Sequence, residues 1–551
     1  MVSLLLAASP FGLAFFLLLC RWQTRTVGLF VFGYLLLLLS IDPHVTLPAS
    51  KAGMALITGT TTAFTILIII FPALFLYHLQ RTCGTLHLLV DQLSAFLPDQ
   101  QLQVLFLVLC LCPLFEALCG FGISILLVAP ILLLLNVQPI RVLLLCLLGQ
   151  ATVAWGAMGV AITVGAQITA FSVSALGSMI SILSAPLLFL VGVATLVVIG
   201  MDAVKRWWWL VGCNTIVFTA VTWVCSRWLS VEVAGMLAAL AGGIFFYGVA
   251  VLLQKKAHRW EPRQQQRVPA TTKALFPYAS LLILLLLSHV FPLAPWLQHH
   301  LVFSVAAWHW SFALLYTPGF WIFLVIGLSL LVLKPTWEQF RQAVHSTTQQ
   351  FSPVAITILS FLWVAQVMDA NGMTALLGSA SAQLGTNYRW LSPLLAAMSG
   401  WLTGSVVGGN SALALLQTAM ARHMDLSQLA ILATQTVGAA VGRMLTPSCL
   451  ILISSATQVP NAENLLLRKG GVLVGILLLA LTLWLDIVLG FSWMTMGLGI
   501  FMTLLLAVLL TMILDASLPT AVAAASPLPL MGNLSLSDMA NMPTMVEKKV
   551  Q

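Results

Sequence analysis

The sequence predicts an all-α polytopic membrane protein with about 12 to 14 transmembrane segments, in two pseudo-repeats with broken or re-entrant helices near the midplane. Three observations support this fold class. Of the 551 residues, 60% are hydrophobic and only 7% are charged, and the mean hydropathy is +1.05. Apolar stretches long enough for a spanning helix of about 20 residues recur from Leu4 to Leu514. A glycine-rich polar cluster interrupts these stretches once in each half of the chain.

The first apolar segment runs from Ser3 to Cys20 and is predicted to be a retained span. No basic residue precedes it, and Arg21 and Arg25 follow it, which is the reverse of a secretory signal peptide. The longest connector, Gln254 to Lys273, carries six basic residues. Because cytoplasmic loops of membrane proteins are enriched in Lys and Arg, this connector is expected to be cytoplasmic.

Composition changes along the chain predict its organisation into segments. After Asp515 the sequence is rich in Ser, Pro, Met and Asn and has little hydrophobic periodicity, which is typical of disorder. The expected order is membrane spans at 1–90, a first repeat core with a broken segment at 91–203, membrane spans at 204–253, the basic cytoplasmic connector at 254–275, membrane spans at 276–350, a second repeat core with a broken segment at 351–486, a last span at 487–514 and a disordered tail at 515–551.

The composition also excludes several classes of function. The formal net charge is +8, but the basic residues are spread through the loops, so they indicate membrane topology and no nucleic-acid partner. The nine cysteines form no CxxC pair, which excludes the usual disulfide and zinc patterns. The commonest metalloprotease, P-loop and hydrolase motifs do not occur. We therefore expect no enzyme activity, no catalytic residues, no metal and no cofactor.

Two polar interruptions of the apolar runs are the strongest functional signal. The first spans Pro113 to Ser124 and the second spans Gly400 to Ser411. Each is followed by a segment rich in Gln, Thr and Gly, at Gln150 to Gly159 and at Gln435 to Arg443. Irregular backbone is tolerated at membrane depth only where it is buried or lines a cavity. The pattern is typical of a transporter with its site between two repeats; the alternative is that the glycines only allow close helix packing.

Charged residues within the apolar runs give the next signal, because a charge at the bilayer centre costs at least about 2.5 to 3.5 kcal/mol. Glu116 lies beside the first interruption and can couple transport to protons, or it can cap the free N–H groups of a broken helix. Arg443 can hold a carboxylate by a bidentate pair, or it can pair with an acid such as Glu116. Asp369 is expected to end a helix, and Asp486 to reach the membrane interface.

Helix ends at the interruptions would direct partial positive charge at a bound anion. With the polar residues nearby, they define the candidate site. The residues expected to bind the substrate are Gly120, Gly122, Ser124, Gln150, Thr152, Thr403, Ser405, Asn410, Ser411, Gln435, Thr436 and Arg443, and the residue expected to couple protons is Glu116.

At these residues the chain resembles the L-lactate permease family. Phe115 to Gly122, Phe-Glu-Ala-Leu-Cys-Gly-Phe-Gly, is similar to the family's Glu-Gly-Ala-Ala-Gly-Phe-Gly, and Trp155 to Gly159 is similar to its Phe-Gly-Ala-Met-Gly. In the second half, Leu402 to Ser405 followed by Asn410 resembles Leu-Thr-Gly-Ser and its asparagine. Gly442-Arg-Met444 then resembles Gly-Lys-Met. The resemblance covers 92–201 and 351–485, and the middle matches only in hydropathy.

The resemblance implies a secondary active transporter that imports L-lactate or related 2-hydroxy monocarboxylates, such as glycolate and D-lactate, by proton symport across the inner membrane. Its partners would be the small organic anion, the proton and membrane lipid, and it allows a homo-oligomer. The segment Ser405 to Asn410 lacks the acid and hydroxyls of the family's Ser-Asp-Thr-Ser-Ser-Asn. A carrier of the same fold for another small organic anion, with sodium coupling, is therefore the alternative. An intramembrane enzyme, an assembly subunit of a larger complex and a channel are further rivals.

Overall fold

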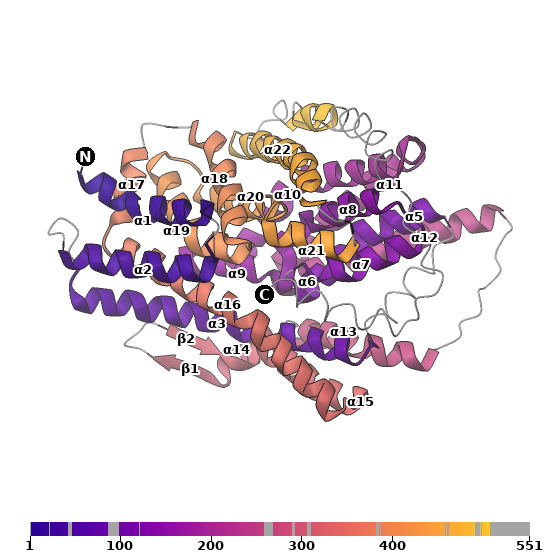
Figure 1. Cartoon of the computed structure of the whole chain (residues 1–551), viewed down its shortest axis with the longest axis horizontal. Helices are drawn as coiled ribbons and strands as arrows, with labels where there is room; N and C mark the ends of the chain where they lie inside the picture. The colour runs from indigo at the N-terminus through magenta and orange to yellow at the C-terminus, as the bar shows by residue number, and fades with distance from the viewer. Residues whose placement is uncertain are drawn as a thin grey trace.

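The computed structural model describes most of residues 2–508 and consists almost entirely of helices (Figure 1). It does not describe residues 1, 21, 42–46, 86–98, 121, 258–267, 289–292, 306–309, 382–384, 386, 458, 460–461, 491–495, 498, 507 and 509–551. The tail predicted at 515–551 and the centre of the predicted connector at 254–275 therefore lie outside the described residues. Both ends of that connector are helical, because α12 (Val231–Ala257) and α13 (Val268–Ser288) extend into it.

The N-terminal helices form one layer with a helix from the second half of the chain. This layer contains α1 (Val2–Leu19), α2 (Thr24–Ile41), α3 (Ala49–Thr82) and α16 (Trp337–Ala370), and α16 packs along both α2 and α3 (Figure 1). A capping box starts α16: the Thr336 hydroxyl accepts from the Gln339 backbone N–H, and the Gln339 side chain accepts from the Thr336 backbone N–H. The two bonds pair backbone N–H groups at the start of the helix that have no partner within it.

The first repeat contains the first predicted break. Its elements are α5 (Gln100–Phe106), the π-helical turn η2 (Leu107–Leu111), α6 (Cys112–Cys119), α7 (Ile123–Leu134), α8 (Pro139–Leu148), the 3₁₀ segment η3 (Gly149–Trp155), α9 (Gly156–Thr169) and α10 (Val173–Ile199). Between α6 and α7 the backbone takes positive φ at Gly120 (69°) and Gly122 (78°). Only glycine adopts this conformation without strain, so the glycines of the motif are what allows the helix to break.

The second repeat also contains a broken helix, then a bent helix pair and a long last helix. It contains α18 (Tyr388–Thr403), α19 (Val406–His423), α20 (Gln428–Arg443), α21 (Pro447–Thr457) and α22 (Ala462–Leu489). Its first break falls at Gly404, with φ of 71°, and Ser405 then caps α19 by accepting from the Gly408 N–H at 2.8 Å. Each repeat also has a second break, since α8 and α9 bend by 41° and α20 and α21 by 44°. Both predicted interruptions are confirmed.

The two repeats exchange helices at these second breaks. In the second repeat α20 packs on α18 and α19, but α21 packs on α7 and α8 of the first repeat. In the first repeat α9 packs on α19 of the second. The central helices of Figure 1 accordingly mix colours from the two halves of the chain. Residues at the breaks are thus placed between the repeats.

The segment between the repeats contains a feature that the sequence did not predict. Its elements are α11 (Met201–Trp228), α12, α13, α14 (Leu293–His299), β1 (Val302–Val305), β2 (Trp310–Ala313), η5 (Leu314–Tyr316) and α15 (Pro318–Leu333), followed after α16 by α17 (Met373–Ser381). The strands pair antiparallel, with Val302 opposite Ala313 and Val305 opposite Trp310. Apolar residues alone suggested a span here, whereas β-branched and aromatic residues also favour strands.

Seven helices in the described part of the chain are long and apolar enough to cross a membrane, or up to nine if each bent pair is one span. Shorter apolar helices accompany them at Leu4–Leu18, Thr24–Ser40, Ser124–Leu134, Phe276–Leu285 and Pro318–Leu333. The membrane fold class is confirmed. Hydropathy counts an apolar segment whether or not its helix is long enough to cross, so the predicted count of about 12 to 14 includes these shorter helices.

Candidate functional site

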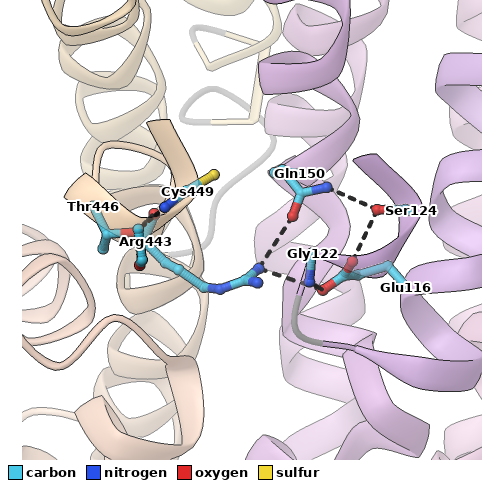
Figure 2. A network of polar contacts seen from close by, with 8 residues as sticks. Glu116, Gly122, Ser124, Gln150, Arg443, Thr446 and Cys449 are labelled. Carbon is cyan, nitrogen blue, oxygen red and sulfur yellow. Dashed lines mark hydrogen bonds and ion pairs between the residues drawn. The ribbon is translucent and has the colours of Figure 1, made fainter. Parts of the chain in front are cut away.

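Glu116 lies on the last turn of α6 beside the first break, and its side chain is only 1% exposed. Its carboxylate accepts from the Gly122 backbone N–H at 3.3 Å and from the Ser124 hydroxyl at 2.9 Å (Figure 2). It also faces the Arg443 guanidinium at 3.3 Å. Glu116 therefore caps the broken helix, which was the structural role expected for it, and forms the ion pair that was the structural alternative for Arg443.

Arg443 ends α20 in the second repeat and reaches toward the first (Figure 2). Its side chain is 9% exposed. One nitrogen, Nη1, donates to Glu116 Oε1 at 3.3 Å and to Gln150 Oε1 at 3.3 Å. In the described part of the chain Nη2 and Nε make no hydrogen bond. Among the described residues Nη1 is therefore hydrogen-bonded, whereas the edge formed by Nη2 and Nε is free, with Gly122 beside Nη2.

Gln150 completes a closed ring of hydrogen bonds. Its Nε2 donates to the Ser124 hydroxyl at 2.8 Å, and that hydroxyl donates to Glu116 at 2.9 Å. Its Oε1 accepts from Arg443, so donors and acceptors alternate around the ring. Gln150 belongs to the 3₁₀ segment η3 at the second break of the first repeat, as Arg443 belongs to the corresponding break of the second. The two breaks therefore meet at this ring.

A left-handed turn packs against the ring. Ala157, Met158 and Gly159 take φ of 48°, 58° and 65° at the start of α9. A Cβ added to Gly156 would lie 3.5 Å from Glu116 Cγ, and one added to Gly120 would lie 2.8 Å from Ala157 Cβ. Left-handed backbone costs roughly 1 to 2 kcal/mol for each non-glycine residue. The first repeat thus holds strained backbone directly behind the ion pair.

Asn410 and Thr436 form a second contact between the repeats. The Asn410 amide donates to the Ala161 carbonyl of α9 at 2.8 Å and to the Thr436 hydroxyl at 3.0 Å. Asn410 is fully buried, and its Oδ1 has no hydrogen-bond partner among the described residues. An amide oxygen buried in this way is an acceptor without a donor, which costs roughly 1 to 3 kcal/mol.

Gln435 is not at the ring; it belongs to a separate buried network within the second repeat. Its Nε2 donates to the Ser399 hydroxyl at 2.8 Å and to the Gly409 carbonyl at 3.2 Å, and its Oε1 accepts from Gln417 at 3.0 Å. Gln417 in turn bonds Tyr388 and Ser392. Because both groups of its amide are occupied, Gln435 joins α18, α19 and α20 in this conformation.

The remaining predicted residues cap local backbone. Thr403 donates to the carbonyls of Ser399 at 2.7 Å and Ser405 at 2.9 Å, and Ser411 donates to Val407 at 2.9 Å. Thr152 lies on η3, and its side chain is outside the described residues. The structure therefore brings Glu116, Gly122, Ser124, Gln150 and Arg443 together; it does not bring the second-repeat hydroxyls to the same ring.

Sequence reasoning missed Thr446, which joins the last turn of α20 to α21 beside Arg443 (Figure 2). The Thr-Pro pair at 446–447 is a typical helix start and could have indicated it. Asp369 accepts from the Thr374 hydroxyl one residue before the end of α16, as expected for a helix end. Asp486 pairs with Arg389 at 2.7 Å, which the sequence did not suggest.

A helical membrane protein with two broken repeats and a buried ion pair between them has the architecture of a secondary transporter. The sequence model described as L-lactate permease matches residues 3–491, and the chain belongs to this family. It is therefore a multi-pass membrane transporter with a small-molecule substrate. The family confirms the predictions of a permease and of a transporter rather than an enzyme.

Curated relatives agree with the family. The L-lactate permease of Salmonella typhimurium is 23% identical over 448 residues, which cover 73% of this chain and 80% of the relative. The L-lactate permease of Escherichia coli K12 is 24% identical over 441 residues, with the same coverage. The glycolate permease GlcA of Escherichia coli K12 is 23% identical over 456 residues, again 73% and 80%. Among solved structures, the YdaH transporter of Alcanivorax borkumensis is similar with a TM-score of 0.47 and 15% identity, covering 81% of this chain and 88% of that one.

Proposed function

We propose that the protein imports L-lactate or a related 2-hydroxy monocarboxylate, such as glycolate or D-lactate, by proton symport across the inner membrane. The observation that carries the proposal is the buried pair of Arg443 and Glu116 between the two repeats, at 3.3 Å, with one edge of the guanidinium free. Relatives of both kinds, lactate and glycolate permeases, support the substrate class.

Binding of the carboxylate is assigned to Arg443. An acid with a pKa of about 4 is an anion at neutral pH, and a guanidinium holds a carboxylate by two parallel hydrogen bonds. The free edge formed by Nη2 and Nε has this geometry. Gly122 lies beside it, since a Cβ there would be 3.6 Å from Nη2 and 3.1 Å from Leu452 Cδ2, so no side chain from this position covers the edge. Ser124 and Gln150 hold the opposite side of the site, where Gln150 accepts from Nη1 and Ser124 donates to Glu116.

Coupling follows from the competition between two carboxylates for one arginine. While Glu116 is charged it holds Nη1 and neutralises Arg443, so a second anion gains little. Once Glu116 is protonated, the buried arginine has no counter-charge, and the substrate carboxylate supplies it. Proton and anion therefore favour each other's binding, and by linkage each strengthens the other equally. The loaded site then carries no net change in charge.

Co-transport of a proton also removes the electrical cost of import. An anion moving alone into a negative interior loses about 2.3 kcal/mol per 100 mV. One proton per monocarboxylate cancels this. The helix exchange at the second breaks gives the carrier a means of alternating access, because movement of one repeat changes the position of α21 on α7 and of α9 on α19.

The test is uptake of labelled L-lactate by the purified protein in liposomes, with and without an inward proton gradient. We expect accumulation that a protonophore abolishes and that Arg443→Ala removes. Arg389→Ala, which breaks the half-exposed pair with Asp486, is the matched control and should keep uptake. Uptake that a proton gradient does not increase would overturn the proton coupling, and a folded protein without any lactate or glycolate uptake would overturn the substrate class.

Sodium coupling is the second candidate, and the unpartnered Oδ1 of Asn410 favours it. Amide and carbonyl oxygens in broken-helix transporters are suited to sodium. A sodium gradient in place of the proton gradient separates the two: accumulation driven by sodium alone, lost in Asn410→Ala, would support the second candidate.

A further inference from the structure

We propose that Thr446 is the positioning residue of the anion site: its hydroxyl fixes the bend between α20 and α21 and so holds the Arg443 guanidinium in place. The inference rests on the proposed function, because it concerns the residue that would bind the carboxylate. Thr446 was not among the residues predicted from the sequence, and it does not touch the ring of Glu116, Ser124 and Gln150 itself.

The hydroxyl of Thr446 satisfies backbone groups on both sides of the bend. It donates to the Arg443 carbonyl at 3.0 Å and accepts from the Cys449 N–H at 3.3 Å. The Thr446 N–H also bonds the Arg443 carbonyl, at 3.1 Å. Thr446 is 2% exposed, so no solvent replaces these bonds if the hydroxyl is lost. One side chain thus ties the last residue of α20 to the first turn of α21.

The neighbouring proline makes this tie necessary. Pro447 opens α21 and has no N–H, so it cannot continue the hydrogen bonding of α20. The residue before a proline is also disfavoured in the helical conformation. The chain must therefore bend here, by 44°, and the angle depends on what joins the two helices. Within hydrocarbon an unpaired backbone group costs several kcal/mol, so the hydroxyl stabilises the bend by pairing such a group.

A small change in the angle between α20 and α21 would move the Arg443 guanidinium relative to its partners. α20 packs on α18 and α19, whereas α21 packs on α7 and α8, so the bend sets how the two repeats face each other at this point. Both bonds of Arg443 Nη1 are 3.3 Å long, near the upper limit for an N–H donor. A shift of a few tenths of an ångström is enough to lose them. Thr446 therefore acts on the substrate through Arg443.

The experiment compares Thr446→Val, which keeps the shape and removes the hydroxyl, with Thr446→Ser, which keeps the hydroxyl. In liposomes we expect Thr446→Val to raise the KM for L-lactate roughly two- to tenfold, the equivalent of one hydrogen bond, with the maximal rate changed less than about twofold. Thr446→Ser should stay within about twofold of wild type in KM. Thr457→Val is the matched control: Thr457 is 2% exposed at the end of α21, and among the described residues it bonds only the local carbonyls of Ile453 and Ser454.

A double-mutant cycle separates positioning from general stability. In an Arg443→Lys background the effect of Thr446→Val on KM should largely disappear, since the fork that it positions is gone. Equal effects in both backgrounds, or an equal effect of Thr457→Val, would overturn the inference.

Hydrogen exchange of segment 443–449 tests the tie without any substrate. Thr446→Val should speed exchange of the Cys449 amide, and Thr446→Ser should not. Unchanged exchange would overturn the inference even if lactate transport is established. Faster exchange in a protein that transports no lactate or glycolate would overturn only the proposed function.

Discussion

The side-chain amide of Asn410 donates to the backbone carbonyl of Ala161 at 2.8 Å, which joins the second half of the chain to the first at a point separate from Arg443 and Glu116. Ala161 follows the left-handed turn at Ala157 to Gly159 by less than one helical turn. Gly156, directly before that turn, lies against Glu116, since a Cβ there would be 3.5 Å from Glu116 Cγ. The two contacts between the repeats are therefore linked through one short strained segment.

Removal of this contact should destabilise the fold. Asn410→Ala loses two buried hydrogen bonds and leaves the Thr436 hydroxyl with one partner fewer, so we expect the free energy of unfolding to fall by about 1 to 3 kcal/mol. Thermal unfolding in detergent measures it. Gln23→Ala, which removes an exposed bond to Arg25, should change it by less than about 0.5 kcal/mol. Equal effects of the two changes would show that the buried bond is not made.

Neutralisation of Glu116 should uncouple transport from protons. Glu116→Gln keeps an acceptor and the shape but cannot exchange a proton, so exchange of labelled for unlabelled lactate at equal concentrations should persist while gradient-driven accumulation is lost. Counterflow and accumulation assays in the same liposomes measure both. Glu338→Gln, at an exposed site on the first turn of α16, should keep both activities. Full accumulation by Glu116→Gln would remove Glu116 from the coupling.

Loss of one member of the ion pair should cost more stability than loss of both. Arg443→Gln leaves a buried carboxylate without its counter-charge, which lowers the free energy of unfolding by about 3 to 5 kcal/mol. The double variant Glu116→Gln with Arg443→Gln removes both charges and should recover most of this, without recovering lactate uptake. Chemical unfolding compared with uptake measures the two. If the double variant is as unstable as the single one, the pair does not form.

Because the backbone of the first repeat is strained, introducing a glycine there and removing one should have opposite effects on the free energy of unfolding. Ala157→Gly relieves a residue at φ 48° and should raise the free energy of unfolding by about 0.5 to 1 kcal/mol. Gly120→Ala does the reverse, because the residue has φ of 69° and its new Cβ would lie 2.8 Å from that of Ala157. Melting temperatures of both variants check this. A destabilised Ala157→Gly variant would contradict the left-handed turn.

The sequence predicted the site best at residue types that have few structural roles within a membrane, namely glycines in broken helices and charged residues in apolar runs. Gly120, Gly122 and Gly404 predicted the helix breaks because glycine takes a positive φ without the strain that other residue types incur. Glu116 and Arg443 stood out because charges in apolar runs need partners, and the two residues are each other's partner, as the alternative role of Arg443 predicted.

Neutral polar residues were harder to assign, because an amide can serve a substrate or a neighbouring helix. Gln150 and Gln435 occupied matching positions in the two motifs, yet Gln150 contacts Arg443 and Gln435 contacts Gln417. The two glutamines differ in their position relative to the helix end. The helix α8 has 10 residues and ends before Gln150, whereas α20 has 16 residues and contains Gln435. Only the packed structure shows which side chains then reach the interface.

The sequence separation of 327 positions from Glu116 to Arg443 also sets an order of events during synthesis. At about 5 to 20 residues per second, the ribosome needs on the order of tens of seconds to reach the arginine after the acid has been made. Throughout that interval the first repeat has an acid without its arginine partner, so the nascent chain gains by keeping this acid near water. The ion pair can form only after both repeats have been synthesised. A truncated chain that lacks Arg443 keeps an unpaired acid, by which quality control can recognise it.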